Sequence, residues 1–368
     1  MAFYFIFVFS FYFLSLLLLT VSWVKQVRKP LAQTSKNIFI SVIIPFRNEA
    51  DNLVNLLRSI LQLKYPVSDF EVIVVDDHSE DTSMKVLEKV RETFSTLKIE
   101  KLDDSQQGKK AALTLGINIA SGEIIATTDA DCLVPCDWLQ CINAGFQNEN
   151  TNMLIGAVSL KDRGTFFNRL QNIEWASVIG TGVAMCGLRN PLMCNGANLS
   201  FRKKVFEEVK GYSGNEHILS GDDEFLMRKI HNLKPESIQV LSVLSPVVTE
   251  PQRSLGGFIQ QRLRWASKWK VNSSGVARSF ALAVLLLQGS WLCFAGWGIL
   301  NLPLQVIVLV FGMKVFGELM FLVTVSRSLR MRFGLIPFLA LQFLYPVYVL
   351  FTGLFSQIKD HEWKGRKS

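Results

Sequence analysis

This chain has four apolar stretches that are each long enough to cross a bilayer as a helix. One lies at the start of the chain and three lie near its end, so the polar residues are concentrated in the middle. The first covers residues 2–24 and has no charged residue, and the others cover 280–300, 303–325 and 333–355. A helix of about 20 apolar residues spans the hydrocarbon core of a membrane. The mean hydropathy of +0.26 is correspondingly high for a soluble protein. We therefore expect an integral membrane protein with one central polar domain.

The charges around the first stretch predict its orientation. A cleaved signal peptide is disfavoured because the stretch is too long, lacks a basic start and has no small-residue cleavage site. Lys25, Arg28, Lys29 and Lys36 follow it, and no charged residue precedes it. The positive-inside rule then places the N-terminus outside and the chain from residue 36 in the cytoplasm. The expected location is the plasma or inner membrane.

The C-terminal third is harder to orient. Three crossings would place the basic tail 359–368 outside, whereas its Lys and Arg residues favour the inside. Either the last apolar stretch is re-entrant around Pro337 and Pro346, or one stretch does not span. Lys314 and Glu318 lie one turn apart within an apolar stretch, which predicts a buried pair.

The expected organisation has four parts. These are an N-terminal membrane helix over 1–25, an α/β domain over 36–275, a membrane region of two or three helices over 276–358, and the basic tail.

Charge and cysteine usage argue against two other classes of function, nucleic-acid binding and zinc binding. The net charge of +8 comes largely from basic clusters that flank the apolar stretches, and no nucleic-acid motif accompanies them, so no nucleic-acid partner is expected. The six cysteines include no C-x-x-C pair, which favours buried, reduced thiols. A zinc site at Cys132, Cys136 and Cys141 is the less favoured alternative.

The middle of the chain alternates between strand and helix patterns. Apolar strands are predicted at 41–45, 70–75, 98–102 and 123–128, with helices over 48–61, 82–93 and 109–120 between them. Such alternation predicts an α/β fold with a largely parallel sheet, in which ligands bind beyond the carboxyl ends of the strands. A helix over 137–146 and a strand over 153–160 follow. The stretch 166–188 is either a core helix or a helix that lies on the membrane or lines an acceptor groove, and 258–271 is a basic, Trp-bearing helix.

Acidic residues follow two of these strands. Asp129 and Asp131 are separated by one residue after the fourth strand, so their side chains project to the same side of an extended chain. Two carboxylates of this kind suit Mg²⁺ or Mn²⁺ together with water and diphosphate oxygens. Asp76 and Asp77 close the second strand, either as turn residues or as acceptors for a nucleoside, and Glu49 lies in the first strand–helix loop.

Two later motifs have both a structural and a chemical interpretation. Asp223 lies at a predicted helix start, where a capping role and a general-base role are compatible. Gln261, Arg264 and Trp265 occupy one face of a helix, where they suit diphosphate binding and acceptor stacking or, alternatively, anchoring at the membrane interface. The dinucleotide-binding motif G-x-G-x-x-G is absent after the first predicted strand. A P-loop is absent too, because the segment that begins at Gly108 lacks the upstream glycine and the following Ser or Thr.

Taken in their order along the chain, these motifs resemble those of a membrane-bound family 2 glycosyltransferase, in the branch of cellulose, hyaluronan and ceramide glucosyl transferases. The matching segments are 41–49, 74–82, 108–113, 129–131, 196–202, 221–223 and 261–265. The resemblance implies a GT-A fold, which is a Rossmann-like α/β domain, here flanked by transmembrane helices. It also implies a nucleotide-sugar donor and inversion at the anomeric carbon.

The resemblance assigns a role to each motif. It implies that Glu49 and Asp77 contact the nucleoside, and that Asp129 and Asp131 hold the metal and the diphosphate. It makes Asp223 the general base, and Gln261, Arg264 and Trp265 the residues that close the site on donor and acceptor. Gly196 stands where the family places the end of the acceptor. Asn195 replaces a Cys typical of cellulose synthases, so the acceptor is not inferred from them.

The expected function is thus metal-dependent transfer of a sugar from a nucleotide-diphosphate sugar to a lipid, lipid-linked or polysaccharide acceptor at the cytoplasmic membrane face. A processive polysaccharide synthase is an alternative, although the few membrane segments favour one or a few transfers unless a homo-oligomer forms a channel. A non-catalytic membrane scaffold or transport partner is an alternative of a different class, but it predicts the loss of at least one acidic motif.

Overall fold

The structure is a computed structural model, and it describes residues 1–29, 34, 36–94, 96–214, 221–267 and 275–355, together with 362–363 and 366–367. The chain divides into two compact units. The sheet unit consists of Lys25–Lys161 and Met185–Glu250, and the helical unit consists of Met1–Val24, Asp162–Ala184 and Pro251–Ser368. The domain boundaries expected at residues 25, 36, 275 and 358 stay a proposal.

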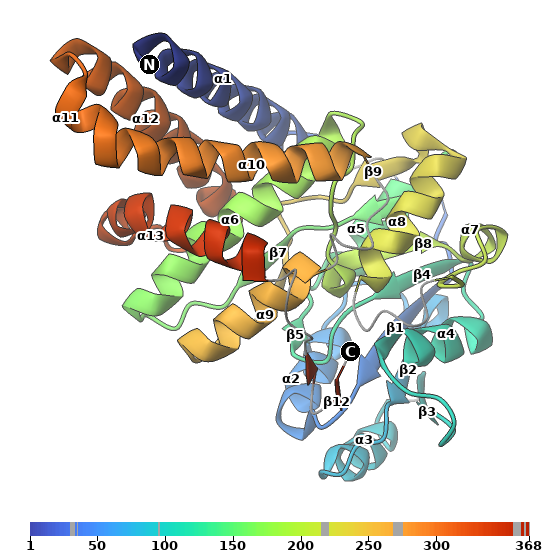
Figure 1. The fold of residues 1–368 in the computed structure, drawn as a ribbon. Helices are drawn as coiled ribbons and strands as arrows, with labels where there is room; N and C mark the ends of the chain where they lie inside the picture. The colour runs from blue at the N-terminus through green and yellow to red at the C-terminus, as the bar shows by residue number, and fades with distance from the viewer. Residues whose placement is uncertain are drawn as a thin grey trace. The chain divides into compact units, whose positions relative to one another are not determined.

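The sheet unit alternates strands and helices along most of its length (Figure 1). Its first half contains β1 (Ile40–Phe46), α2 (Ala50–Leu61), η1 (Val67–Asp69), β2 (Phe70–Asp76), α3 (Ser83–Arg91), β3 (Leu97–Lys101), α4 (Lys109–Ile119), β4 (Ile124–Thr127), β5 (Cys132–Leu133) and α5 (Trp138–Phe146). Its second half contains β6 (Met153–Ile155), β7 (Val158–Leu160), η2 (Gly196–Asn198), β8 (Leu199–Arg202), α7 (Lys203–Glu208), α8 (Asp222–Leu233), η3 (Pro235–Ser237), β9 (Ile238–Val240) and β10 (Val247–Thr249).

Seven strands form the main sheet in the order β3-β2-β1-β4-β8-β6-β9. The four strands predicted from the sequence pair in parallel, and every residue of β1, β2 and β4 is buried, as expected for parallel strands covered on both faces. The prediction of a largely parallel sheet holds for four of the six strand pairs, which include β6 with β9, but β8 runs antiparallel to both β4 and β6. The sheet is therefore mixed, and the parallel half ends at the strand that precedes Asp129.

A small second sheet has the order β5-β10-β7. The single strand predicted over 153–160 is in fact two, because Gly156 and Ala157 separate β6 in the main sheet from β7 in the small one. Asn198 explains this break: its side-chain amide donates to the carbonyl of Ala157 at 2.8 Å, and its backbone carbonyl accepts from the N–H of Gly156. The η2 turn is thereby fixed beside the end of β4.

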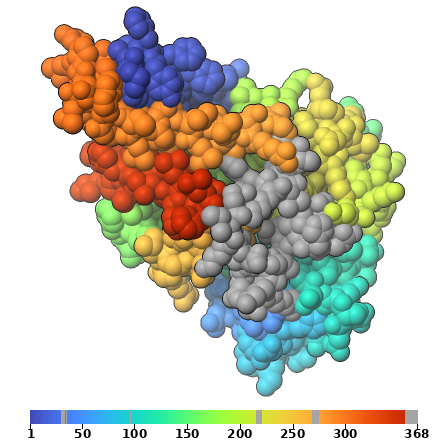
Figure 2. Space-filling view, in the orientation of Figure 1, coloured from blue at the N-terminus to red at the C-terminus, as the bar shows by residue number. Residues whose placement is uncertain are grey.

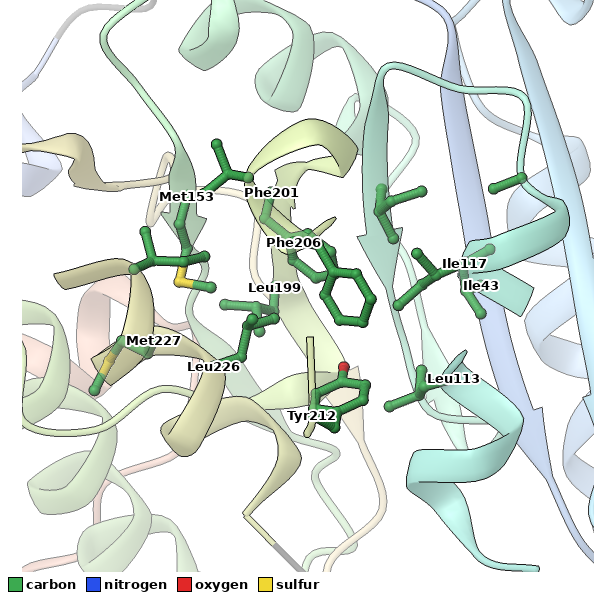
Figure 3. Packing of buried hydrophobic residues seen from close by; sticks show 14 of the residues in the cluster. Ile43, Leu113, Ile117, Met153, Leu199, Phe201, Phe206, Tyr212, Leu226 and Met227 are labelled. Atoms are coloured by element: carbon green, nitrogen blue, oxygen red, sulfur yellow. The ribbon is translucent and has the colours of Figure 1, made fainter. Parts of the chain in front are cut away.

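The core of the sheet unit lies between the main sheet and helices α4, α7 and α8. Figure 3 shows side chains from these elements meeting in one cluster. Ile43 of β1, Leu113 of α4, Phe201 of β8 and Leu226 of α8 are at most 1% exposed. Packing of this cluster fixes where α4 and α8 begin, and both helices start next to the acidic residues described below.

The helical unit contains the long apolar helices (Figure 1). Its elements are α1 (Ala2–Val27), α6 (Phe166–Gly187), α9 (Leu255–Ser267), α10 (Gly275–Cys293), the π-helical turn η5 (Phe294–Gly298), α11 (Ile299–Asn301), α12 (Leu304–Ser328), α13 (Leu335–Phe355) and the short β11 (Glu362–Trp363) and β12 (Arg366–Lys367). The stretch predicted as helical over 258–271 is α9, and residues 268–271 lie outside the described part of the chain.

Four helices of the described chain are long and apolar enough to cross a membrane: Ala2–Val27, Gly275–Asn301, Leu304–Ser328 and Leu335–Phe355. The last of these, α13, continues through Pro346 without a break, so the structure gives no support to a re-entrant loop there. Most of the basic tail lies outside the described residues. The side of the membrane on which the tail lies stays a prediction.

Tight packing and buried polar contacts hold the helical unit together. Helices α1 and α10 lie side by side, with Phe9 of α1 against Trp291 of α10 at 5.7 Å between ring centroids (Figure 2). Helix α6 packs against α12 at Gly180, where a Cβ atom would lie 2.8 Å from the Val325 side chain. This contact supports the core-helix interpretation of α6. The predicted pair of Lys314 and Glu318 is confirmed, at 2.8 Å.

Candidate active site

Asp129 and Asp131 follow β4 directly, at the carboxyl end of the parallel strands. The preceding Thr127 donates a hydrogen bond to the carbonyl of Gly196 at 2.7 Å, which fastens the η2 turn next to them. The carboxylate of Asp131 is half-buried and accepts a weak contact from the thiol of Cys132 at 3.5 Å. The sequence therefore places this pair at the edge of the sheet where ligands of such folds bind.

A lysine from a different helix lies beside Asp129. Lys109 is the first residue of α4, and its ammonium group lies 2.6 Å from Oδ1 of Asp129 and 3.7 Å from Oδ2 of Asp222. It enters the helix from Gly108, whose φ of +93° is a conformation that favours glycine. One cation thus bridges the acidic residue after β4 and the acidic residue that begins α8.

Neighbouring charges shift the pKa values of Lys109 and Asp131. Burial alone would lower the pKa of Lys109, but the negative charges of Asp129 and Asp222 outweigh it and raise the pKa. Burial, together with repulsion from Asp129 and Glu49, raises the pKa of Asp131 to about 6. Asp129 thus stabilises the ammonium group of Lys109 and at the same time disfavours ionisation of Asp131.

Asp76 and Asp77, both buried, organise the loops around the cluster. Asp76 accepts a hydrogen bond from the N–H of Ser79 at 2.9 Å, which confirms its predicted part in a turn. Asp77 accepts from the N–H of Gly108 at 3.0 Å and thereby ties the loop after β2 to the start of α4. Glu49 lies at the start of α2 and accepts from the side chain of Asn52 at 2.6 Å.

Asp222 and Asp223 occupy the first turn of α8, so the predicted helix start is confirmed. The predicted capping role of Asp223 is wrong, because the helix begins at Asp222 and Gly221 is its N-cap residue. Asp223 accepts a hydrogen bond from the N–H of Gly196 at 3.0 Å, and its other oxygen accepts from the N–H of Glu224. A Cβ atom at Gly196 would lie 3.3 Å from Oδ2 of Asp222 and 3.4 Å from Nζ of Lys109. The structure thus brings Gly196, both aspartates and Lys109 together within the sheet unit.

Gln261, Arg264 and Trp265 belong to α9 in the helical unit. Two of them contact a residue that was not among the predicted site residues: Arg262 donates to the side-chain oxygen of Gln261, and its guanidinium carbon lies 4.4 Å from the ring centroid of Trp265. Arg262 also forms an ion pair with Glu174 of α6. The predicted contacts of these residues with donor and acceptor stay a prediction.

Asp129 and Asp131 fit a hard divalent cation better than a soft one. Their ligands are carboxylate oxygens, and a cation would relieve the repulsion between them, which acts together with burial to raise the pKa of Asp131. Within the described residues, no three His, Cys, Asp or Glu side chains are gathered as a ready-made metal site. The zinc alternative at Cys132, Cys136 and Cys141 therefore has no support among the described residues.

Sequence reasoning missed Lys109 and the Arg262–Glu174 pair as parts of these two clusters. The segment 108–113 was compared with a P-loop and matched to the family, but neither comparison gave Lys109 a role. It begins α4, which follows β3, a strand that pairs with β2. Arg262 lies between two predicted site residues, Gln261 and Arg264, and that position in the motif was the available signal. Glu174 lies 88 residues before its partner, and nothing local indicates the pairing.

Comparisons with known proteins identify a domain within the chain. Residues 41–210, which contain Glu49, Asp77, Asp129, Asp131 and Gly196, match the family model "Glycosyl transferase family 2". The chain carries a family 2 glycosyltransferase domain. It is accordingly a glycosyltransferase, and the alternative of a non-catalytic scaffold or transport partner is not supported.

Two relatives of known name share the domain. Glycosyltransferase AglE from Haloferax volcanii is 28% identical over 268 residues, which are 70% of this chain and 82% of AglE. Poly-beta-1,6-N-acetyl-D-glucosamine synthase from Staphylococcus aureus is 26% identical over 235 residues, which are 62% of this chain. That match spans 53% of the synthase, so the chain corresponds to about half of it.

A solved structure confirms the fold. The mannosyltransferase PcManGT from Pyrobaculum calidifontis, in complex with GDP-Man and Mn²⁺, superposes with a TM-score of 0.57 at 18% sequence identity. The superposition covers 90% of this chain and 99% of that protein. The predicted GT-A fold, with transmembrane-type helices beside a mixed α/β sheet, is therefore confirmed.

Proposed function

We propose that this glycosyltransferase moves a sugar from a nucleotide-diphosphate sugar to a hydroxyl of a lipid or lipid-linked acceptor, with inversion, at the cytoplasmic face of a membrane. The observation that carries the proposal is the cluster of Asp129, Asp131, Lys109 and Asp223 at the carboxyl end of the parallel strands. Such a cluster combines oxygen ligands, a fixed cation and a carboxylate that can accept a proton. Transfer from a diphosphate needs these three components.

The donor's diphosphate fits next to Lys109 and the aspartates. Its negative charge would compete with Asp129 for the ammonium group, and the start of α4 offers a favourable helix end for anions. Asp77 and Glu49 would hold the nucleoside. Arg264 and Gln261 of α9 would hold the diphosphate from the acceptor side, in keeping with the family resemblance.

The proton of the acceptor hydroxyl is assigned to Asp223. Asp222 lies 3.7 Å from the ammonium group of Lys109, so its carboxylate faces a cation. Asp223 is oriented by the backbone N–H groups of Gly196 and Glu224, one at each oxygen, and a carboxylate oxygen has more than one lone pair with which to accept a proton. An acceptor that ends at Gly196, with Trp265 stacking on it, would present its hydroxyl to this carboxylate. Loss of the proton lets the oxygen attack the anomeric carbon opposite the departing diphosphate.

Asp129 and Asp131 would hold Mg²⁺ or Mn²⁺, which supplies positive charge for the leaving diphosphate when bound. The two carboxylates provide only part of a coordination shell, as is usual for Mg²⁺ bound with a phosphate ligand. Lys109 supplies one positive charge next to Asp129. The donor would therefore bind together with the metal, because each lacks a full set of partners without the other.

The membrane placement of the proposal rests on the apolar helices and their flanking charges. Lys25, Arg28, Lys29 and Lys36 follow α1 and favour the cytoplasmic side for the chain that enters β1. Nucleotide sugars in the cytoplasm would then reach the acidic cluster, and a lipid acceptor would approach from the plasma or inner membrane.

A processive synthase is the second candidate, and the similarity to the staphylococcal synthase favours it. Product length distinguishes the two candidates. A single added sugar that extracts with the lipid supports the main proposal, whereas a long polymer that remains after lipid extraction supports the synthase. Size measurement of the purified protein in detergent would show whether a homo-oligomer accompanies polymer formation.

One assay tests the proposal as a whole. Purified protein is mixed with UDP-N-acetylglucosamine, GDP-mannose and a wider panel of nucleotide sugars, with Mg²⁺ or Mn²⁺ and a membrane lipid extract as acceptor. Release of nucleoside diphosphate that requires both the metal and the extract is the expected result. Absence of release with every donor, from protein that remains folded and monodisperse, would contradict the proposal.

A further inference from the structure

We propose that Arg262 and Glu174 are positioning residues for the reaction, and that their buried ion pair holds Gln261 and Trp265 of α9 in their working conformation. This inference rests on the proposed function of α9. Neither residue would touch the substrates. They act through the two side chains that Arg262 contacts.

The ion pair joins α9 to α6 with a two-point geometry. Nε of Arg262 lies 2.7 Å from Oε1 of Glu174, and Nη2 lies 2.5 Å from Oε2. Arg262 is 5% exposed and Glu174 is 6% exposed. Two parallel hydrogen bonds between planar groups fix orientation as well as distance, which a single contact between flexible side chains does not.

The remaining surface of the guanidinium group is covered by aromatic rings. Its carbon lies 4.4 Å from the ring centroid of Trp265, 4.5 Å from that of Phe258 and 5.5 Å from that of Trp175. Trp175 and Trp265 also contact each other, with ring centroids 5.7 Å apart. The indole of Trp265 is therefore held from two sides, by a cation from its own helix and by an indole from α6.

The third nitrogen of Arg262 extends this fixation to Gln261. Nη1 donates to the side-chain oxygen of Gln261, so the amide of Gln261 keeps its N–H groups for another acceptor. The same guanidinium group thus orients both neighbours that the family resemblance assigns to donor and acceptor. Substrate-facing side chains would otherwise exchange between rotamers on a helix surface.

A purely stabilising role explains this arrangement less well. Burying two charges costs several kcal/mol of desolvation, and well-packed apolar residues often stabilise a fold equally or better. Orientation is what a charged planar pair supplies and an apolar pair does not. The charge of Arg262 is also well protected, because burial would lower its pKa while the carboxylate of Glu174 raises it.

The decisive variants are Glu174→Gln and Arg262→Lys. Glu174→Gln keeps the shape but removes the charge and one acceptor, and Arg262→Lys keeps the charge but loses the planar fork. Asp162→Asn is the matched control, because Asp162 forms a more exposed ion pair with Arg332 in the same unit, and neither residue belongs to α9. Trp265→Ala reports the loss of the positioned residue itself.

Two measurements are made on each full-length variant in detergent. Hydrogen exchange over 255–267 reports the order of α9. The ratio of transfer to the lipid extract over hydrolysis in its absence, with Mn²⁺ and UDP-N-acetylglucosamine or GDP-mannose, reports positioning, because loss of folded enzyme lowers both rates equally. We expect faster exchange in α9 and a transfer-to-hydrolysis ratio lower by about 10- to 100-fold in both variants, the scale of a small misplacement near the reacting atoms. Asp162→Asn should match the parent.

The outcomes separate this inference from the proposed function. The positioning role is overturned if the transfer-to-hydrolysis ratio stays like the parent's in Glu174→Gln and Arg262→Lys while Trp265→Ala is inactive. The proposed function would then still stand. A parent-like ratio in Trp265→Ala as well shows that α9 takes no part in transfer, and the inference fails with that part of the proposal. Equal loss of transfer and hydrolysis in both variants also overturns it, because the pair would then serve stability alone.

Discussion

Removing one charge from the buried pair of Lys314 and Glu318 should destabilise the helical unit more than removing both. The ammonium group lies 2.8 Å from Glu318 and 2.7 Å from the amide oxygen of Gln342, and it lies over the ring of Trp291 at 4.6 Å. Glu318 accepts further hydrogen bonds from Tyr12 at 2.8 Å and from Gln342 at 2.9 Å. Helices α1, α10, α12 and α13 all contribute to this network.

The expected loss of stability in each single variant follows from the burial of the two charges. Lys314 is 2% exposed and the side chain of Glu318 is 12% exposed, so neither charge reaches solvent easily. Breaking a buried pair from one side costs about 3–5 kcal/mol, because the remaining charge has no counter-charge. Each kcal/mol shifts the Tm of a cooperative unit of this size by about 2–4 °C, so either single variant should lower Tm by roughly 6–20 °C.

The variants are chosen to keep shape and hydrogen bonds. Glu318→Gln leaves an oxygen for Tyr12 but no charge for Lys314, and Lys314→Met leaves Glu318 with its two neutral donors. The double variant removes both charges and should melt within about 3 °C of the parent, since replacing a whole buried pair is often neutral. Thermal unfolding in one detergent, followed by loss of monodisperse protein, provides the comparison.

Additive losses in the double variant would refute the reasoning. They would show that each side chain contributes through contacts of its own rather than through charge compensation. Single variants that melt like the parent would show that water or detergent solvates the remaining charge. Burial of Lys314 and Glu318 would then not determine the free energy of unfolding. The exposed pair of Asp162 and Arg332 is the control, and Asp162→Asn should shift stability by less than about 1 kcal/mol.

The remaining predictions concern the acidic cluster and the topology. Asp131→Asn should abolish transfer while the protein still inserts and folds, and excess chelator should abolish transfer by the parent; full turnover in chelator would contradict the metal assignment. Asp223→Asn should retain donor binding and reduce transfer by about 10²–10⁴, measured by donor titration and initial rates; near-parent transfer by this variant with an inactive Asp222→Asn would assign the base to Asp222. A cysteine introduced at Ser105 should resist an impermeant thiol reagent in intact cells and react after lysis; efficient labelling in intact cells would reverse the orientation.

The sequence predicted the parallel half of the sheet because the information there is local. The strands at β1, β2 and β4 are short apolar runs followed by polar turns, and each lies within a residue or two of its predicted bounds. β8 escaped prediction because its four residues include Ser200 and Arg202, and only pairing with β4 and β6 makes it a strand. The break between β6 and β7 depends on Asn198, which lies more than 40 residues later.

In the candidate site, too, some residues could be predicted from local sequence and others could not. Asp129 and Asp131 were found because their spacing on an extended chain is itself the signal, and Asp223 because it lies at a predicted helix start. The position of Lys109 depends on two partners, 20 and 113 residues away, that only the folded sheet brings together. A spacing rule applied along the chain has no access to that kind of contact.

The charges that sequence reasoning missed share a physical property, since each is compensated by a partner remote in sequence. Lys109 bridges the residues after β4 and at the start of α8, and Arg262 pairs with Glu174 across two helices. A charge kept out of water is costly unless a partner is held in place, so such a residue persists where the fold can supply that partner. For Lys109 the partners are aspartates of the proposed active site, and for Arg262 the partner is Glu174 of α6. Arg262 in turn contacts Gln261 and Trp265, which are proposed to meet the substrates. Removing the partner of either cation should therefore disturb the reaction before it disturbs the fold.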